Sequence, residues 1–280
     1  MMDCGLLSIK GKVRENDEDS IICMNISMMN EGKENTVTLA AVADGMGGGE
    51  KGEFASKYAI QRLVKSIIDI FLDGDLSSDK IKQAFSNSVS EANEFLKEYK
   101  RNNNIKMIGT TLTAVLINID TMYVMNIGDS RTYLISKDGK IKKKTKDHSF
   151  VQKLVDEGFL DESNIRTHPQ RNIVTRVIDG TDDSVPDFYE WRIYKGDTIV
   201  LCCDGLWEPL EDKVIGKTVS SGMNLQETVK LMVDTANTID GSDNISAVIL
   251  RQVEGQDEEP LLKVATRKLI AKTKENVSND

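Results

Sequence analysis

Two apolar runs in this sequence end in the same pair of residues, an aspartate followed by a glycine. LAAVADG ends in Asp44 and Gly45, and IVLCCDG ends in Asp204 and Gly205. An aspartate at the end of a buried strand projects from the edge of the sheet. The glycine allows a tight turn that can point a backbone carbonyl at the same cation. A single Asp-Gly pair is ordinary turn chemistry, but the repeated motif indicates a site for a hard metal ion.

Further acids stand at the boundaries of predicted strands. They are Glu18 and Asp19 before one strand, Asp129 after another and Asp243 before a third. Gathered at one sheet edge, these acids would repel one another by several kcal/mol, on the order of a few pKa units, unless cations neutralised them. The only histidines, His148 and His168, form no zinc-binding pair, so oxygen ligands dominate and magnesium or manganese is favoured over zinc.

Alternating and continuous apolar segments predict the strands that must position these acids. The predicted strands are Ser20 to Ile26, Thr36 to Ala43, Leu112 to Ile119, Met122 to Ile127, Thr132 to Ser136, Thr198 to Cys203 and Ile245 to Leu250. Helical spacing predicts a helix from Phe54 to Phe71, a second from Ile81 to Tyr99 and a third from about Leu225 to Ala236. We expect a layered α/β domain in which the first two helices pack on one sheet face.

Composition excludes several classes of protein. The chain has 280 residues and a net charge of −9, with no basic cluster interleaved with aromatics, so nucleic-acid binding is not expected. No run approaches the roughly 20 apolar residues that span a bilayer, and we expect a cytoplasmic protein. Cys4, Cys23, Cys202 and Cys203 match neither a metal motif nor a secreted disulfide framework, and are interpreted as buried reduced thiols within strands.

The composition changes after the last predicted strand. Residues 254–280 are rich in charge, with apolar residues such as Leu261, Leu262 and Leu269 among lysines and arginines. This charged tail could form a basic amphipathic helix that touches a membrane or a partner. We favour the alternative, an additional helix packed on the body or a frayed tail, and expect no membrane contact.

Eight sequence blocks occur in the order found in bacterial metal-dependent phosphatases of the 2C type. They are GKVRENDED, VADGMGGG, GTTLTAV, NIGDSRTYL, DHSFVQKLVDEG, HPQRNIVTR, CCDGLWE and GSDNISAVIL. The chain resembles this family over residues 5–251. The resemblance implies an α+β fold: a four-layer αββα sandwich of two antiparallel sheets flanked by helix pairs, with the metal centre at one end. It also implies a phosphatase domain over residues 1–253, with a flap subdomain at about 148–171.

The resemblance assigns metal-binding roles residue by residue. Asp44 matches the ligand that bridges two cations, Asp204 and Asp243 complete the first metal, and the Gly45 carbonyl belongs to the second. Glu18 and Asp19 match the acidic pair that binds the second metal directly or through water. Asp129 matches the residue that shares a third, weaker cation with Asp204. The implied cofactors are two tightly bound Mn²⁺ or Mg²⁺ ions and a third, weaker one.

Three more positions bear on the chemistry. Arg14 matches the arginine that binds the substrate phosphate, and a guanidinium fork suits phosphate oxygens. Asp17 stands where many relatives have Asn or Gln. Met46 stands where eukaryotic relatives have a histidine proposed as general acid, so this chain is expected to work without that acid.

The implied activity is hydrolysis of phosphoserine and phosphothreonine in proteins by metal-activated water, with Asp44 and Asp204 as the catalytic residues. The expected partners are phosphoprotein substrates and a serine/threonine kinase with its targets, in signal transduction, and the expected state is a monomer. Two alternatives remain open: an inactive relative that binds a specific phosphoprotein, and a partner-switching phosphatase with one dedicated substrate.

Overall fold

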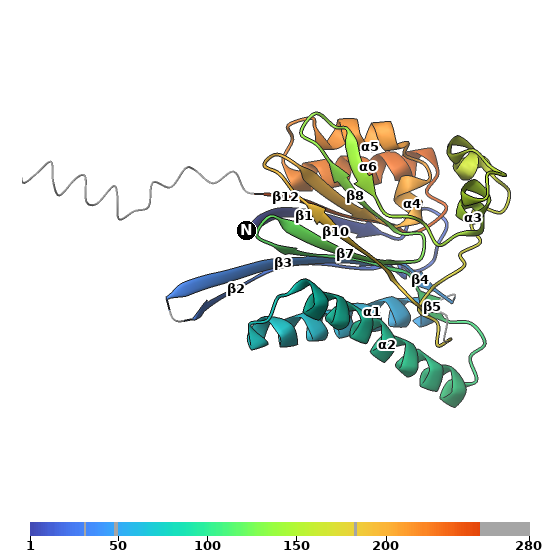
Figure 1. The fold of residues 1–280 in the computed structure, drawn as a ribbon. Helices are drawn as coiled ribbons and strands as arrows, with labels where there is room; N and C mark the ends of the chain where they lie inside the picture. The colour runs from blue at the N-terminus through green and yellow to red at the C-terminus, as the bar shows by residue number, and fades with distance from the viewer. Residues whose placement is uncertain (31, 48–49, 182–183, 253–280) are drawn as a thin grey trace, which may run out of the picture.

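The fold consists of two antiparallel sheets stacked face to face (Figure 1). The computed structural model describes residues 1–30, 32–47, 50–181 and 184–252. Sheet A has the order β1 (Met2–Ile9), β12 (Ile245–Gln252), β11 (Thr198–Cys202), β8 (Arg131–Ile135) and β9 (Ile141–Lys144). Sheet B has the order β10 (Asp187–Arg192), β7 (Thr121–Ile127), β6 (Leu112–Asn118), β3 (Lys33–Ala43) and β2 (Ser20–Asn30). A short ribbon pairs β4 (Gly45–Met46) with β5 (Gly109–Thr110).

Helices cover the outer face of each sheet. The long pair α1 (Glu50–Asp73) and α2 (Ser78–Asn103) packs on sheet B, and α5 (Asp212–Val219) and α6 (Leu225–Ile239) pack on sheet A (Figure 1). The expected αββα sandwich is therefore confirmed. None of the helices in the described part of the chain is long and apolar enough to cross a membrane.

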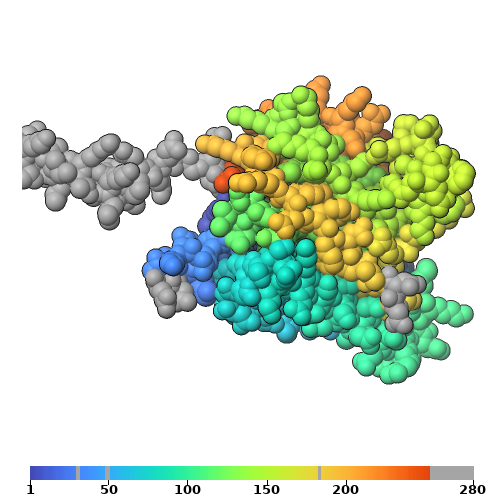
Figure 2. Space-filling model, in the orientation of Figure 1, coloured from blue at the N-terminus to red at the C-terminus, as the bar shows by residue number. Residues whose placement is uncertain are grey.

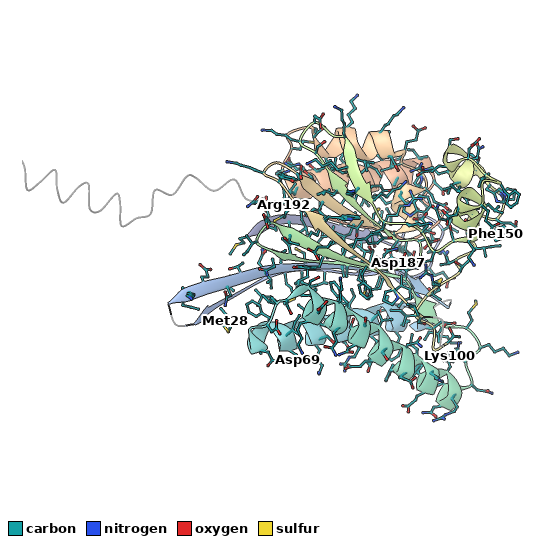
Figure 3. All side chains as sticks on the ribbon, in the orientation of Figure 1. Met28, Asp69, Lys100, Phe150, Asp187 and Arg192 are labelled. Atoms are coloured by element: carbon teal, nitrogen blue, oxygen red, sulfur yellow. The ribbon has the colours of Figure 1, made fainter. Side chains whose placement is uncertain are left out.

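Strand β3 shows why the sandwich forms. Its side chains alternate between two cores: Leu39 and Ala41 pack against the helices, whereas Ala40 and Val42 pack between the sheets. Side chains fill the space between the two sheets (Figure 3). Because both faces of the strand are buried in its second half, its sequence is continuously apolar from Leu39 to Ala43, directly before Asp44.

A smaller unit lies at one end of the sandwich. It contains α3 (Phe150–Asp156) and a 3₁₀ helix (Glu162–Thr167), and both views show it at the end opposite to the β2–β3 hairpin (Figures 1 and 2). Ser149 caps α3 by accepting a hydrogen bond from the Gln152 N–H. This unit occupies the region expected to be the flap subdomain.

Several elements were not predicted from the sequence. Strands β1, β9 and β10 and helix α5 are short or mix polar with apolar residues. In β1, Gly5 interrupts the pattern because α6 crosses it closely: a Cβ at this position would lie 2.3 Å from the Leu225 carbonyl oxygen. The charged tail, residues 254–280, lies outside the described residues.

Candidate metal centre

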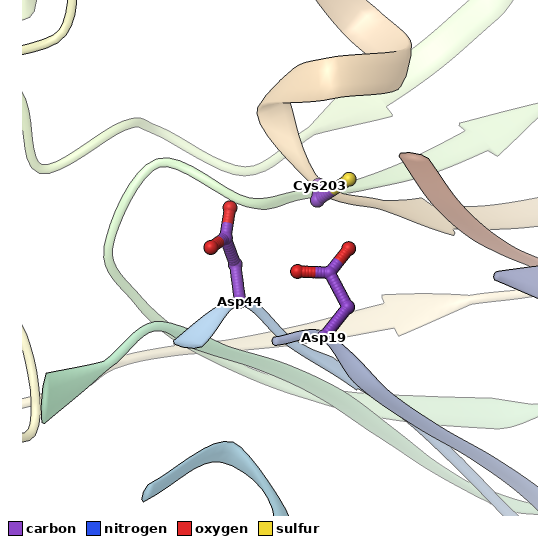
Figure 4. Close-up of side chains that lie close together, drawn as sticks. All are labelled: Asp19, Asp44 and Cys203. Carbon is purple, nitrogen blue, oxygen red and sulfur yellow. The ribbon is translucent and has the colours of Figure 1, made fainter. Parts of the chain in front are cut away.

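The pairing of β2 with β3 brings the first two acids together. Ser20 pairs with Ala43, so Asp19 just before β2 and Asp44 just after β3 are neighbours at the same end of sheet B. Their carboxylates point into a common space beside Cys203 (Figure 4). Potential ligand atoms of Asp19, Asp44 and Cys203 all lie within 4.8 Å of one another.

Two of the remaining acids come from sheet A, and the third lies in a connection between the two sheets. Asp204 follows β11 and begins the short helix α4 (Asp204–Trp207), Asp129 lies between β7 and β8, and Asp243 precedes β12. The negative charges of these three residues and of Asp19 all raise the pKa of Asp44. The sandwich thus gathers at one end the five aspartates that the sequence predicts.

Burial and mutual repulsion disfavour ionisation of the gathered acids. Burial, reinforced by Asp17 and Asp204, raises the pKa of Asp19 to about 8. Burial and then the nearby charge of Asp243 raise the pKa of Asp204 to about 7. Burial also raises the pKa of Asp44 and of Asp129 well above the usual value. The cluster therefore carries strong electrostatic strain at neutral pH.

The donor set fits divalent cations. Both carboxylate oxygens of Asp19 and Oδ1 of Asp204 are buried without a hydrogen-bond partner in the described ranges. Native proteins rarely leave buried carboxylate oxygens unpartnered. Hard cations such as Mg²⁺ and Mn²⁺ prefer several carboxylate oxygens, and their charge would remove the repulsion.

Backbone contacts hold Asp44 in place. Its N–H donates to Thr111 Oγ1 at 3.0 Å, and its carbonyl oxygen accepts from the Thr111 N–H and from Thr110 Oγ1, each at 2.9 Å. The next residue must be glycine, because a Cβ on Gly45 would lie 2.4 Å from the Glu18 carbonyl oxygen. Thr110 and Thr111 thus hold the backbone of Asp44 in place.

Asn244 organises the loop between β1 and β2, and the sequence analysis missed it. Its Oδ1 accepts from the Glu18 N–H at 2.9 Å, and its Nδ2 donates to the carbonyls of Lys10 and Asn16 at 3.1 and 2.9 Å. Its position between Asp243 and a buried strand was the available signal. The amide fixes the segment that carries Arg14, Glu18 and Asp19.

The Glu18 side chain lies against helix α1. Glu18 is buried, and its Oε2 would lie 2.2 Å from a Cβ built on Gly52 of α1, so the carboxylate sits against the first turns of that helix. It does not belong to the group formed by Asp19, Asp44 and Cys203 among the described residues.

Arg14 and Asp243 form an ion pair at the rim of the centre. Arg14 Nη2 lies 2.7 Å from Asp243 Oδ2, with side-chain exposures of 50% and 34%. The guanidinium is therefore accessible to solvent beside the buried acids. The predicted phosphate-binding residue and one predicted metal ligand contact each other directly.

Two buried side chains hold the loop that carries Asp129. Trp207 Nε1 donates to the Asp129 carbonyl at 2.9 Å, and His148 Nδ1 accepts from the Gly128 N–H at 3.1 Å. Arg131 stacks 3.4 Å over the Trp207 ring and pairs with the buried Asp147 at 2.6 Å. His148 thus forms hydrogen bonds within the fold, as the sequence indicates.

The interpretation of the cysteines needs correction. Cys203 does not lie within a strand: β11 ends at Cys202, and Cys203 precedes α4 beside the acids. Cys4 and Cys23 do lie in strands, but both are only half-buried. A pattern search for metal motifs could not find Cys203, because its neighbours in space come from β2 and β3.

Known proteins resemble this chain in sequence and in fold. A family model described as protein phosphatase 2C matches residues 28–241. The serine/threonine protein phosphatase PstP of Mycobacterium tuberculosis is 32% identical over 88% of this chain, but the match spans only 44% of the length of PstP. The protein phosphatase PhpP of Streptococcus pneumoniae is 29% identical over 92% of this chain and 100% of its own length.

Solved structures of phosphatases also resemble this chain in fold. The serine/threonine phosphatase of S. agalactiae superposes with a TM-score of 0.77 at 29% identity, covering 90% of this chain and 99% of that one. The catalytic domain of PstP, solved in complex with two manganese ions, gives a TM-score of 0.71 at 28% identity, covering 89% and 97%. This chain therefore belongs to the protein phosphatase 2C family.

Proposed function

We propose that this chain hydrolyses phosphoserine and phosphothreonine in proteins, using two tightly bound Mn²⁺ or Mg²⁺ ions and a third, weaker one. The buried carboxylate oxygens of Asp19 and Asp204, which have no hydrogen-bond partner in the described part of the chain, carry this proposal. They stand at one end of a sandwich whose relatives are serine/threonine phosphatases.

The proposed ligands come from both sheets. They are Asp44 as the bridging ligand, Asp204 and Asp243 for one ion, Glu18, Asp19 and the Gly45 carbonyl for the other, and Asp129 with Asp204 for the third. When bound, the ions supply Lewis acidity that activates water and neutralises charge on the phosphoryl oxygens. Asp44 and Asp204 are the catalytic residues in this proposal, and they stand at the ends of strands from the two different sheets.

Arg14 binds the substrate phosphate in this proposal. Its exposed guanidinium already pairs with one carboxylate oxygen of Asp243. If Asp243 were to hold a cation, Arg14 would be available to form bidentate hydrogen bonds with phosphate oxygens. Met46 follows the Asp44–Gly45 pair and has no proton to donate. The proton for the leaving alkoxide must therefore come from water rather than from this side chain.

The biological setting is also a proposal. Phosphoserine and phosphothreonine residues are products of serine/threonine kinases, so the substrates are the targets of such a kinase. We place the protein in the cytoplasm, as a monomer whose phosphatase domain spans residues 1–253 with a flap subdomain at about 148–171.

Phosphate release from a phosphothreonine peptide with Mn²⁺ tests the function. Asp44→Asn should lower kcat by about 100-fold or more and weaken Mn²⁺ binding measured by calorimetry, because it removes a central charged ligand. Asp69→Asn is the matched control, since Asp69 is exposed on α1 and pairs only with Lys65 among the contacts described. If Asp44→Asn released phosphate at the wild-type rate, the proposed centre would be wrong.

A further inference from the structure

Two cysteines face each other across the edge of the sandwich, away from the metal centre. Cys4 lies in β1, the edge strand of sheet A, and Cys23 lies in β2, the edge strand of sheet B. The two edge strands are in contact although they belong to different sheets. The cysteines are 19 positions apart in sequence but meet because both edges stack at the same side of the fold.

A polar clamp sets the register of this contact. The Met2 N–H donates to Asn25 Oδ1 at 3.3 Å, and Asn25 Nδ2 donates to the Met2 carbonyl at 3.0 Å. Side chains of a strand alternate between its faces, so Cys4 shares a face with Met2 and Cys23 shares a face with Asn25. Stepping two residues from the clamp along each strand brings the two cysteines opposite each other. Both pack against the same apolar cluster between the sheets.

The two thiols interact as hydrogen-bond partners, and this interaction divides their roles. It raises the pKa of Cys4 and lowers the pKa of Cys23. Both side chains are half-buried, so small reagents can reach them. Cys202 and Cys203 are fully buried, and burial raises the pKa of each. Of the four cysteines in the chain, Cys23 is therefore the one most easily converted to a reactive thiolate.

We propose that Cys4 and Cys23 are a redox modification site, at which hydrogen peroxide converts the two thiols into an intrachain disulfide joining the two sheets. The Cys23 thiolate attacks one peroxide oxygen, the O–O bond breaks, and Cys23 sulfenic acid and hydroxide form. The Cys4 sulfur then attacks the sulfenic sulfur, the S–O bond breaks, and the Cys4 proton leaves with that oxygen as water. Hydroxide takes up the proton that Cys23 released. Two thiols and one peroxide thus give one disulfide and two waters.

The bond would close the segment that carries part of the candidate site. Residues 4–23 include Arg14, Glu18 and Asp19, and their loop connects the two strands that the disulfide would join. Closing a segment of this length restricts the unfolded chain and stabilises the fold. This inference does not depend on the proposed phosphatase activity.

The experiment treats the full, reduced chain with hydrogen peroxide in the presence of EDTA, which keeps metal-catalysed oxidation out. Remaining thiols are alkylated, and tryptic peptides are analysed by mass spectrometry without reduction. We expect the peptides containing Cys4 and Cys23 to be joined, with the loss of two hydrogen atoms, and to separate after dithiothreitol. The oxidised chain should melt higher by on the order of 5 °C.

Two variants make the result specific. Cys4→Ser and Cys23→Ser should each fail to form the linked peptide and should show no rise in Tm upon oxidation. Linkage through Cys202 or Cys203, dimers joined by a disulfide between chains, or oxidation of both thiols to sulfinic acids without a bond would each overturn the proposal. So would a wild-type chain in which both cysteines remain fully alkylatable after peroxide treatment.

Discussion

Removing one charge from the acidic cluster should stabilise the metal-free protein, which is the opposite of what most substitutions at a buried site do. We choose Asp204→Asn, because asparagine keeps the shape of the side chain but cannot ionise. Burial, followed by the charges of Asp243 and Glu208, raises the pKa of Asp204 to about 7 from 3.8. At pH 8 without metal, folding must hold this carboxylate in a place that disfavours its charge.

The sign and size follow from the linkage between protonation and folding. A group whose pKa is raised in the fold contributes stability below its unfolded pKa, here 3.8, and loses that contribution as the pH rises through about 7. A difference of about 3 pKa units at about 1.36 kcal/mol each amounts to about 4 kcal/mol. Because the titration of Asp204 is coupled to that of the neighbouring acids, one substitution recovers only part of this free energy. We therefore expect the free energy of unfolding of the variant to rise by about 2 kcal/mol at pH 8, or its Tm to rise on the order of 5 °C.

Thermal denaturation at pH 5 and pH 8 in EDTA measures this effect. The advantage of Asp204→Asn should be roughly a third of its full size at pH 5, which lies about one unit above the unfolded pKa, and full at pH 8. Added Mn²⁺ should then reverse the order, because the wild type binds the ion and gains stability by mass action, whereas the variant has lost a ligand. Adding the metal alone should thus reverse which of the two proteins has the higher Tm.

Asp212→Asn is the control for the loss of a half-buried carboxylate. Burial acts to raise the pKa of Asp212, but Lys144 and Arg166 outweigh it, and the pKa lies below the usual value. Its contribution to stability is present above pH 3.8 and is lost only in acid, so Asp212→Asn should destabilise the protein at pH 8 with or without metal. If Asp204→Asn behaved like this control in EDTA, the acids would not be repelling one another and our reasoning about the centre would be refuted.

Three further outcomes are expected. Exhaustive chelation should abolish hydrolysis of p-nitrophenyl phosphate and phosphothreonine peptide, and Mn²⁺ or Mg²⁺ should restore it; full activity in the chelated protein would contradict metal dependence. Arg14→Ala should raise KM for the phosphopeptide by about 10-fold with a smaller loss in kcat, since the phosphate is already charged before reaction, and Arg14→Lys should recover part of the loss. Met46→His should speed the serine phosphate ester more than the aryl ester in single-turnover assays at pH 6 to 8, because only the alkoxide leaving group needs a proton; an unchanged ratio of the two rates would exclude position 46 as a place for a general acid.

Buried strands and long helices were predictable because each has a strong local pattern. The run ending in Asp44 is apolar on both faces, since one face packs against helices and the other against the second sheet. Helices α1 and α2 show their apolar stripe over many turns. By contrast, β1 has no such pattern, because its Gly5 accommodates the close approach of Leu225 rather than filling a core. Its position depends on β12 and α6, more than 200 residues away in sequence.

The predicted acids were recognised from strand ends, but their supports were not. Asn244 and Trp207 each form side-chain hydrogen bonds to a backbone segment that is distant in sequence. Such a contact leaves no periodic or compositional trace, because any polar residue next to a strand looks alike until the pairing of strands is known. Positions of charged ligands can thus be inferred one by one, whereas the residues that orient them require the assembled sheets.

The proximity of Cys4 and Cys23 could likewise not be predicted from the sequence. Cys4 and Cys23 have no meaningful spacing in the sequence, and although both were expected to lie in strands, nothing in the sequence indicated that these two strands are neighbours. Their proximity arises from stacking of two sheets, which depends on how the edges align rather than on either strand alone. The candidate metal centre also lies between the sheets, with Asp19 and Asp44 from sheet B and Asp204 after a strand of sheet A. Contact between the sheets therefore creates both the acidic centre and the dithiol, and a substitution that shifts one sheet against the other should disturb the two together.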